Sequence, residues 1–161
     1  MTAFEEIAAT STSRMTIVTT RAGDEIDGCL VGFSTQCSIN PVRQLVCLSD
    51  KNRTYELARR ATELVVHPLH DAPHDFELAR LFGEHSARET DKLAACSWVE
   101  GPGGVPVLDG LDWFAGPIVG RFDVGDHVAH VVDVRTGSAP RAHEPWLELR
   151  DVLDLDPGNP P

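Results

Sequence analysis

The sequence has few cations for its length. Its 161 residues include 14 Lys and Arg against 25 Asp and Glu, a formal net charge of −11 at pH 7. Surfaces that bind nucleic acid or anionic membranes need clustered Lys and Arg to compensate phosphate charge. The charge balance therefore predicts no nucleic-acid and no membrane partner, although it stays compatible with one local basic pocket for a phosphate.

Long hydrophobic runs are also missing. No uninterrupted apolar stretch approaches the ~20 residues needed to cross a bilayer. The first residues, MTAFEEIAATSTSR, lack the basic region and apolar core of a secretory signal. We therefore expect a cytoplasmic protein.

Several catalytic and metal-binding patterns are absent as well. There is no GxSxG motif, which argues against a hydrolase, and the four cysteines have no CxxC spacing. His67, His70 and His74 lie near two aspartates, but Pro68 and Pro73 break the helix that would align them as zinc ligands. We expect loop histidines, reduced structural thiols and no metal site.

The residues that are present, 42 % of them hydrophobic, suffice for the core of one domain. We expect an N-terminal arm over residues 1–13, a domain over 14–150 and a C-terminal tail over 151–161. Hydrophobic patterning predicts strands first, short helices in the middle and strands again. The strands are expected at Met15–Thr20, Ile26–Phe33, Leu45–Leu48, Leu64–His67, Leu111–Asp123 and His127–Arg135, and the helices at Arg53–Ala61, His74–Phe82 and Glu84–Leu93. This order favours a mainly β fold, an antiparallel sheet closed into a barrel with short α-helices at its rim.

The stretch Asp27–Pro41 and the segment SDKNRT at Ser49–Thr54 are predicted to be two polar turns flanking one buried strand. Hydroxyl and amide side chains in the first turn can donate hydrogen bonds to phosphate or to the polar edge of a ring, while Gly28 and Gly32 permit close approach of a ligand. The second turn adds Lys51 and Arg53 at a probable helix start, where free N–H groups favour an anion. Composition alone leaves the alternative of ordinary turn and capping residues open.

Five segments, taken in order, resemble the flavin reductase-like family of FMN-binding split barrels. The resemblance covers about residues 14–135. It rests on the run from Gly28 to Pro41 with the strand LVCL, on SDKNRT, on DFELARLFG at Asp75–Gly83, on GGVPVLDG at Gly103–Gly110, and on VGDHVAHVVDV at Val124–Val134.

The resemblance implies an FMN-binding homodimer, or one that takes FAD, with NADH or NADPH as reductant. By position in the family, His127 is expected near the flavin and nicotinamide, and Phe82 near the ring or the dimer partner. The other cofactor-binding residues expected from it fall in the ring end, Gly32, Phe33, Ser34, Thr35, Gln36, Cys37 and Ser38, and the phosphate end, Ser49, Asp50, Lys51, Asn52, Arg53 and Thr54.

The chain departs from the family where many members carry a Thr/Ser-rich run. Leu30, Val31, Gly32, Phe33 and Ser34 stand there instead, so fewer hydroxyls and more backbone would hold the ring edge. The favoured function is NAD(P)H-dependent flavin reduction, with a flavin-dependent monooxygenase as a partner. The alternatives are flavin binding without turnover and an F420- or FMN-dependent oxidoreductase acting on an organic substrate.

Overall fold

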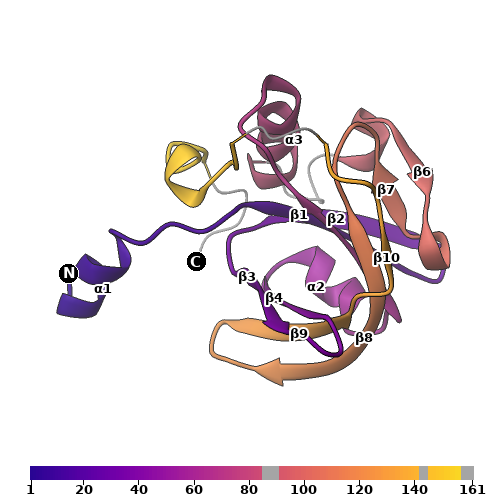
Figure 1. The fold of residues 1–161 in the computed structure, drawn as a ribbon, viewed down its shortest axis with the longest axis horizontal. Coiled ribbons are helices and arrows are strands. Elements are labelled where there is room, and N and C mark those ends of the chain that lie inside the picture. Colours follow the sequence, from indigo (N-terminus) through magenta and orange to yellow (C-terminus); the bar gives the residue numbers. More distant parts are fainter. Residues whose placement is uncertain (85–90, 142–144, 157–161) are drawn as a thin grey trace.

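The fold is built on one curled antiparallel sheet (Figure 1). The computed structural model describes residues 1–84, 91–141 and 145–156. Seven strands follow the order β2-β1-β5-β8-β9-β4-β3, and β10 pairs with β8. Their bounds are β1 (Thr16–Ala22), β2 (Glu25–Val31), β3 (Ser34–Ser38), β4 (Arg43–Ser49), β5 (Glu63–Pro68), β8 (Phe114–Asp123), β9 (His127–Asp133) and β10 (Thr136–Gly137).

Two helices and a small hairpin pack on this sheet, and a further helix, the first in the chain, stands away from it (Figure 1). The α-helices are α1 (Ala3–Ala8), α2 (Arg53–Ala58) and α3 (Pro73–Glu84), and the hairpin joins β6 (Trp98–Glu100) to β7 (Pro106–Leu108). Three single turns of 3-10 helix complete the description, η1 (Leu93–Ala95), η2 (Pro102–Gly104) and η3 (Leu149–Asp151). In Figure 1, α2 lies inside the curl of the sheet and α3 lies over the outside of β1 and β2. The mainly β split-barrel fold expected from the sequence is confirmed.

Strand β1 shows why the sheet is buried on both faces. Side chains alternate across a strand, so successive residues point to opposite sides. Ile17 packs in the cluster that includes Leu78 and Phe82 of α3, whereas Val18 packs in the cluster that includes Ala58 of α2. A continuous β-branched and apolar run is what such a two-sided strand requires.

One local expectation was wrong. Residues 34–38, which we expected in a turn, form strand β3 and pair with β4 in antiparallel register. Strand β3 is at one end of the sheet order, and its side chains are exposed or half-buried. An edge strand held by backbone hydrogen bonds leaves no hydrophobic alternation in its sequence, so the polar residues resembled a turn.

The expected helix at Glu84–Leu93 and the end of the C-terminal tail lie largely outside the described residues, 85–90 and 157–161 being omitted. Within the described part of the chain, no helix is both long enough and apolar enough to span a membrane.

His67 is a fully buried residue of β5 whose two ring nitrogens bind backbone on opposite sides. Its Nδ1 lies 2.9 Å from the carbonyl oxygen of Ile17, and its Nε2 accepts the N–H of Leu108 at 3.0 Å. These partners require the neutral tautomer with hydrogen on Nδ1, because a proton on Nε2 would face the Leu108 N–H. Burial accordingly lowers the pKa of His67 from 6.5 to about 4. An asparagine amide, which has an N–H donor group and a carbonyl acceptor, could serve the same two partners.

We predict that His67 makes the protein less stable in mild acid. As the pH falls from 6.5 towards 4, the unfolded chain takes up a proton at His67 that the folded protein refuses. This lowers the free energy of unfolding by about 3 kcal/mol at most. Urea denaturation across this pH range should show that acid lowers the free energy of unfolding less in His67→Asn than in wild type. Because buried His130 is present in both proteins, its contribution cancels in this comparison. Identical pH profiles would contradict the assignment.

Candidate functional site

A small cavity of ≈ 230 Å³ lies where β2, β4 and β9 meet. The pairing of β4 builds it, because the N–H of Cys47 donates to the carbonyl of Phe33 at 2.9 Å and Ser49 stands opposite His127. Five residues expected from the sequence are thereby brought together: Gly32, Phe33, Ser49, Asn52 and His127.

His127 opens β9 and forms one wall of this cavity. Its ring meets Phe33 edge to face, with the centroids 5.2 Å apart and the planes at 64°. Its Nδ1 lies 2.6 Å from a carboxylate oxygen of Asp126. The hydrogen bond from His127 lowers the pKa of Asp126, so the carboxylate stays ionised and holds the imidazole in place. The ring is therefore oriented by its neighbour on one side and packed on the other.

A larger cleft of ≈ 460 Å³ adjoins the cavity along β3 and β4 and shares with it Gly32, Phe33, Cys47 and Leu149. Ser34, Thr35 and Leu45 line it on the sheet, and three residues of α1 line it on the other side, Phe4, Ile7 and Ala8. The hydroxyl of Ser34 lies 2.8 Å from the amide nitrogen of Gln44, which donates to it. Together the two hollows fall within the range of about 300–1,000 Å³ that is typical of small-molecule sites.

Several polar groups of the turn after β4 are already hydrogen-bonded within the protein. The Ser49 hydroxyl accepts the N–H of Lys51 at 3.4 Å, and the Asn52 side chain caps α2 by accepting the N–H of Thr54 at 3.0 Å. The N–H of Asp50 donates to the carbonyl of Asp126 at 3.0 Å, which ties this turn to the β8–β9 hairpin.

The side chains of two further expected phosphate-end residues bind other elements of the protein. Arg53 pairs with Glu25 at 3.4 Å on the surface. The Thr54 hydroxyl is buried and donates to Asp27 at 3.0 Å. Lys51 is exposed and makes no ion pair among the described residues, so it is the cation of this turn most available to a ligand.

Eight expected residues line neither hollow: Asp50, Lys51, Arg53 and Thr54 in the turn after β4, and Gln36, Cys37, Ser38 and Phe82. Gln36, Cys37 and Ser38 continue along β3 beyond the cleft, where Gln36 donates through its side chain to the Ser38 carbonyl. Phe82 is 2 % exposed in the core, and a Cβ placed on Gly28 would come within 2.9 Å of its ring. Gly28 therefore makes room for Phe82.

Several lining residues escaped the sequence reasoning. Cys29, Cys47 and Leu48 line the smaller cavity from β2 and β4, Met15 lines it from the position before β1, and Leu149 reaches it from η3. Alternation along the strands could have found the first four, but no local pattern reveals Leu149. Burial raises the pKa of Cys29 to about 11 and also raises that of Cys47, so both thiols are neutral apolar lining.

The three histidines that resembled a metal cluster are separated. His67 is bound to backbone inside the sheet, His70 pairs with Asp112 at 2.8 Å, and His74 contacts the Asp109 carbonyl at 3.0 Å. No group of three or more His, Cys, Asp or Glu side chains in the described ranges could hold a metal ion.

Residues 9–151 match the family described as "Flavin reductase like domain". The chain belongs to this family. A curated member, the stachydrine N-demethylase reductase subunit Stc3 of Rhizobium meliloti (strain 1021), is 27 % identical over 121 residues, covering 72 % of this chain and 50 % of that protein. The chain thus spans about half the length of this relative.

Solved structures support the same fold. A flavin reductase domain protein from Arthrobacter sp. FB24 superposes with a TM-score of 0.80 at 22 % identity, over 92 % of this chain and 89 % of that one. The NADH:FAD oxidoreductase SgcE6 of Streptomyces globisporus C-1027 gives 0.79 at 21 % identity, over 90 % and 85 %. SgcE6 has also been solved in complex with NAD and FAD fragments. Component B of nitrilotriacetate monooxygenase from Mycobacterium thermoresistibile gives 0.78 at 23 %, over 90 % and 79 %.

Proposed function

We propose that the protein is a flavin oxidoreductase that uses NADH or NADPH to reduce FMN or FAD, and that it supplies reduced flavin to a monooxygenase. The observation that carries this is the meeting of Gly32, Phe33 and His127 with the turn at Ser49 in one hollow, in a chain of the flavin reductase family. The reductase subunit of a demethylase and the component of a monooxygenase among its relatives support the partner class.

The residues of the hollow suit a flat ring with an anionic tail. A Cβ on Gly32 would lie 3.7 Å from Leu149 and Met15, an ordinary van der Waals contact, so the glycine does not relieve a clash within the chain. Leu30, Val31 and Phe33 supply apolar walls. Because hydroxyls are few, backbone groups of this segment would contact the polar ring edge.

When bound, the flavin supplies the hydride-accepting ring, and the protein's task is to hold two rings in contact. His127, fixed by Asp126 and Phe33, would orient the nicotinamide or flavin from the side of the cavity. Lys51 and the Ser49 hydroxyl would hold the phosphate at the other end.

Turnover tests this function directly. Purified protein given FMN or FAD should oxidise NADH or NADPH at roughly 1–1,000 per second, the usual range for enzymes. His127→Leu should lower kcat/KM for the nicotinamide about tenfold or more, because misplaced reactants react slowly. The matched control His74→Leu changes a histidine outside both hollows and should stay within about twofold. Flavin binding without oxidation of either nucleotide would refute the proposal.

The phosphate assignment makes a separate prediction. Lys51→Ala should weaken FMN binding by roughly threefold to tenfold, since one exposed cation contributes modestly. Arg53→Ala should cost less, because Glu25 already pairs with Arg53, and the double variant should cost most. Flavin fluorescence titrations should show no loss for riboflavin, which lacks the phosphate, nor for the surface control Arg59→Ala. Equal losses for FMN and riboflavin would contradict it.

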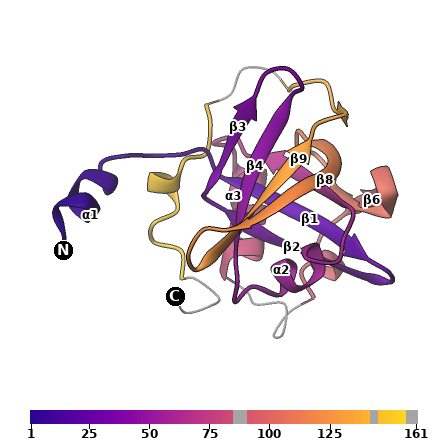
Figure 2. The same ribbon diagram turned by 90° about the horizontal axis from the view of Figure 1, so that it is seen from below.

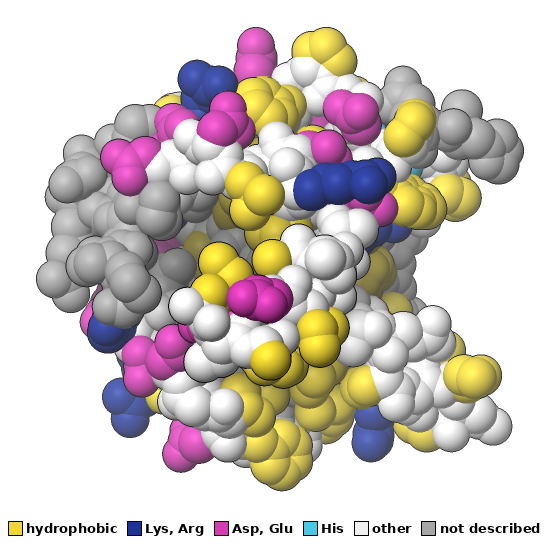
Figure 3. Space-filling view, turned by 90° about the vertical axis from the view of Figure 1, so that its left-hand side faces the viewer, with side chains coloured by type: hydrophobic (Ala, Val, Ile, Leu, Met, Phe, Trp, Pro, Cys, Tyr) yellow, Lys and Arg dark blue, Asp and Glu magenta, His cyan; other side chains and the backbone are white. Residues whose placement is uncertain are grey.

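We also propose that the functional unit is a homodimer joined through α1. This helix has six residues and none of them is buried, although its own capping box fixes its start. It stands away from the sheet in two perpendicular views (Figures 1 and 2), and Phe4 and Ile7 are 77 % and 68 % exposed. So short a helix is marginal in water without packing. The face that carries α1 shows several exposed hydrophobic side chains (Figure 3), and a second copy packed on it would cover them.

Sedimentation should therefore report a dimer for wild type and a monomer for Phe4→Glu/Ile7→Glu, because two charges would have to be buried. Val99→Glu is the matched control, since Val99 is 56 % exposed on β6 at the opposite side of the molecule from α1. A wild-type monomer at all concentrations, or a dimer unaffected by the α1 changes, would contradict this arrangement.

A further inference from the structure

A second cavity, of ≈ 530 Å³, shares no lining residue with the two hollows of the candidate site. It lies among the start of β1, the start of β8 and the segment after β9. Its wall is largely apolar, with Val42, Pro68, Phe114 and Trp146, and Arg14 contributes a cation.

Arg14 is held by two contacts that leave the end of its side chain available. Its Nε donates to the Leu69 carbonyl at 3.3 Å, and its guanidinium carbon lies 3.3 Å from the centroid of the Trp146 ring. The two terminal nitrogens of Arg14 have no hydrogen-bond partner among the described residues. Burial lowers the pKa of Arg14 to about 10, so it stays charged at neutral pH. A partly desolvated cation with spare donors is suited to an anionic ligand.

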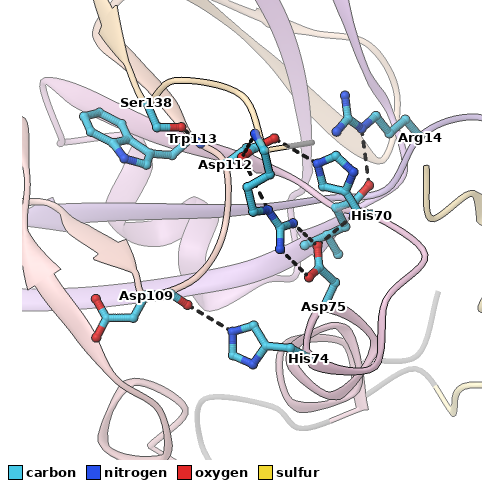
Figure 4. Close-up of polar contacts among 10 residues, drawn as sticks. Arg14, His70, His74, Asp75, Asp109, Asp112, Trp113 and Ser138 are labelled. Atoms are coloured by element: carbon cyan, nitrogen blue, oxygen red, sulfur yellow. Dashed lines mark hydrogen bonds and ion pairs between the residues drawn. The ribbon is translucent and has the colours of Figure 1, made fainter. Parts of the chain in front are cut away.

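The wall beside Arg14 is fixed by a network of buried ion pairs (Figure 4). Arg141 binds both carboxylate oxygens of Asp75 at 3.2 and 2.7 Å, and Asp75 also accepts the N–H of His70 at 2.7 Å. Asp112 accepts from His70 Nε2 at 2.8 Å and from the N–H of Arg141 at 3.0 Å. These contacts fasten Arg141, the neighbour of the lining residue Pro140, to Asp75 of α3 and to Asp112. They also tie both aspartates to His70, which follows β5.

The same hydrogen bonds stabilise the negative charge of Asp112, the acidic residue that lines the cavity. Burial alone would raise the pKa of Asp112, but hydrogen bonds from His70 and Arg141 bring it below its usual value. Its carboxylate is thus ionised and already surrounded by donors. Arg135, the other cation of the lining, pairs with Asp133 at 3.2 Å. Arg14 is therefore the lining cation whose donors a ligand can use without breaking a protein pair.

We propose that this cavity is a binding site for a small aromatic carboxylate, separate from the flavin site. The carboxylate binds the terminal nitrogens of Arg14, which are preorganised by the contact of the guanidinium with Trp146. The aromatic body fills the apolar space beside Phe114 and Pro68. The proposal does not depend on the redox activity, because the two sites share no residue.

Calorimetric titration with 1-naphthoate tests it, with 1-naphthalenemethanol as the neutral analogue of the same shape. Wild type should bind the carboxylate at least about tenfold more tightly than the alcohol, the difference that a charge-assisted hydrogen bond makes. Arg14→Met should abolish that difference, whereas the surface control Arg59→Met should keep it. Val42→Trp, a change at a half-exposed position of the lining, should weaken both ligands by filling the space, and it does not depend on the folding of the Arg14 variant.

FMN added to the same samples distinguishes this site from the flavin site. Binding of naphthoate that is unchanged by FMN supports a separate site. Displacement by FMN, equal affinity for the acid and the alcohol, or binding that Arg14→Met and Val42→Trp leave intact would each overturn the proposal. Absence of binding would also overturn the proposal, whether or not a second copy of the chain covers the cavity.

Discussion

Strand β4 is hydrogen-bonded on both sides, to β3 and to β9, and this double pairing decides where the candidate site lies. On one side the Cys47 N–H meets the Phe33 carbonyl, which fixes the chain as it leaves β2 for β3. On the other side Ser49 stands opposite His127, and the Asp50 N–H continues the contact to Asp126. Segments almost a hundred residues apart thereby form one hollow. A register slip of one residue would turn every side chain of β4 to the other face and remove the hollow.

Because strands of the sheet supply most of its lining, the hollow contains few polar side chains. Most of its lining consists of apolar strand residues, among them two neutral cysteines, and its polar side chains are Ser49, Asn52 and His127, with Lys51 in the adjoining turn. Asp27 and Thr54 form a buried pair. Lys92 lies close by and donates to the carbonyls of Gly28 and Phe82, which fastens the end of α3 to β2. Burial raises the pKa of Asp27 and lowers that of Lys92, while each of the two charges moderates the shift of the other. Asp27, Thr54 and Lys92 thus bind one another and the backbone of the framework.

Much of this could be predicted from the sequence, for physical reasons that differ between elements. The runs that became β1 and β5 are buried on both faces and are therefore largely apolar, so their existence was evident. The run Leu45–Leu48 also revealed β4, but burial on both faces was wrong there, because only Val46 and Leu48 are buried and the alternate residues Leu45 and Cys47 are half-buried. Strand β3 was missed because an edge strand needs only backbone partners. The ordered segments placed Gly32, Phe33 and His127 together, but not the pairing of Arg53 with Glu25 or of Thr54 with Asp27, because long-range side-chain partners leave no local pattern. The contribution of Leu149 and the Arg14 cavity were hidden for the same reason, since the segment after β9 returns to the start of β1 only in three dimensions.

A crystal structure of the protein grown with FMN tests the central claim most directly, because the claim concerns the place of a ligand. The account predicts the flavin ring against Gly32 and Phe33, with His127 at its side and the phosphate beside Ser49 and Lys51. A flavin bound elsewhere, with this hollow left to solvent, would contradict it.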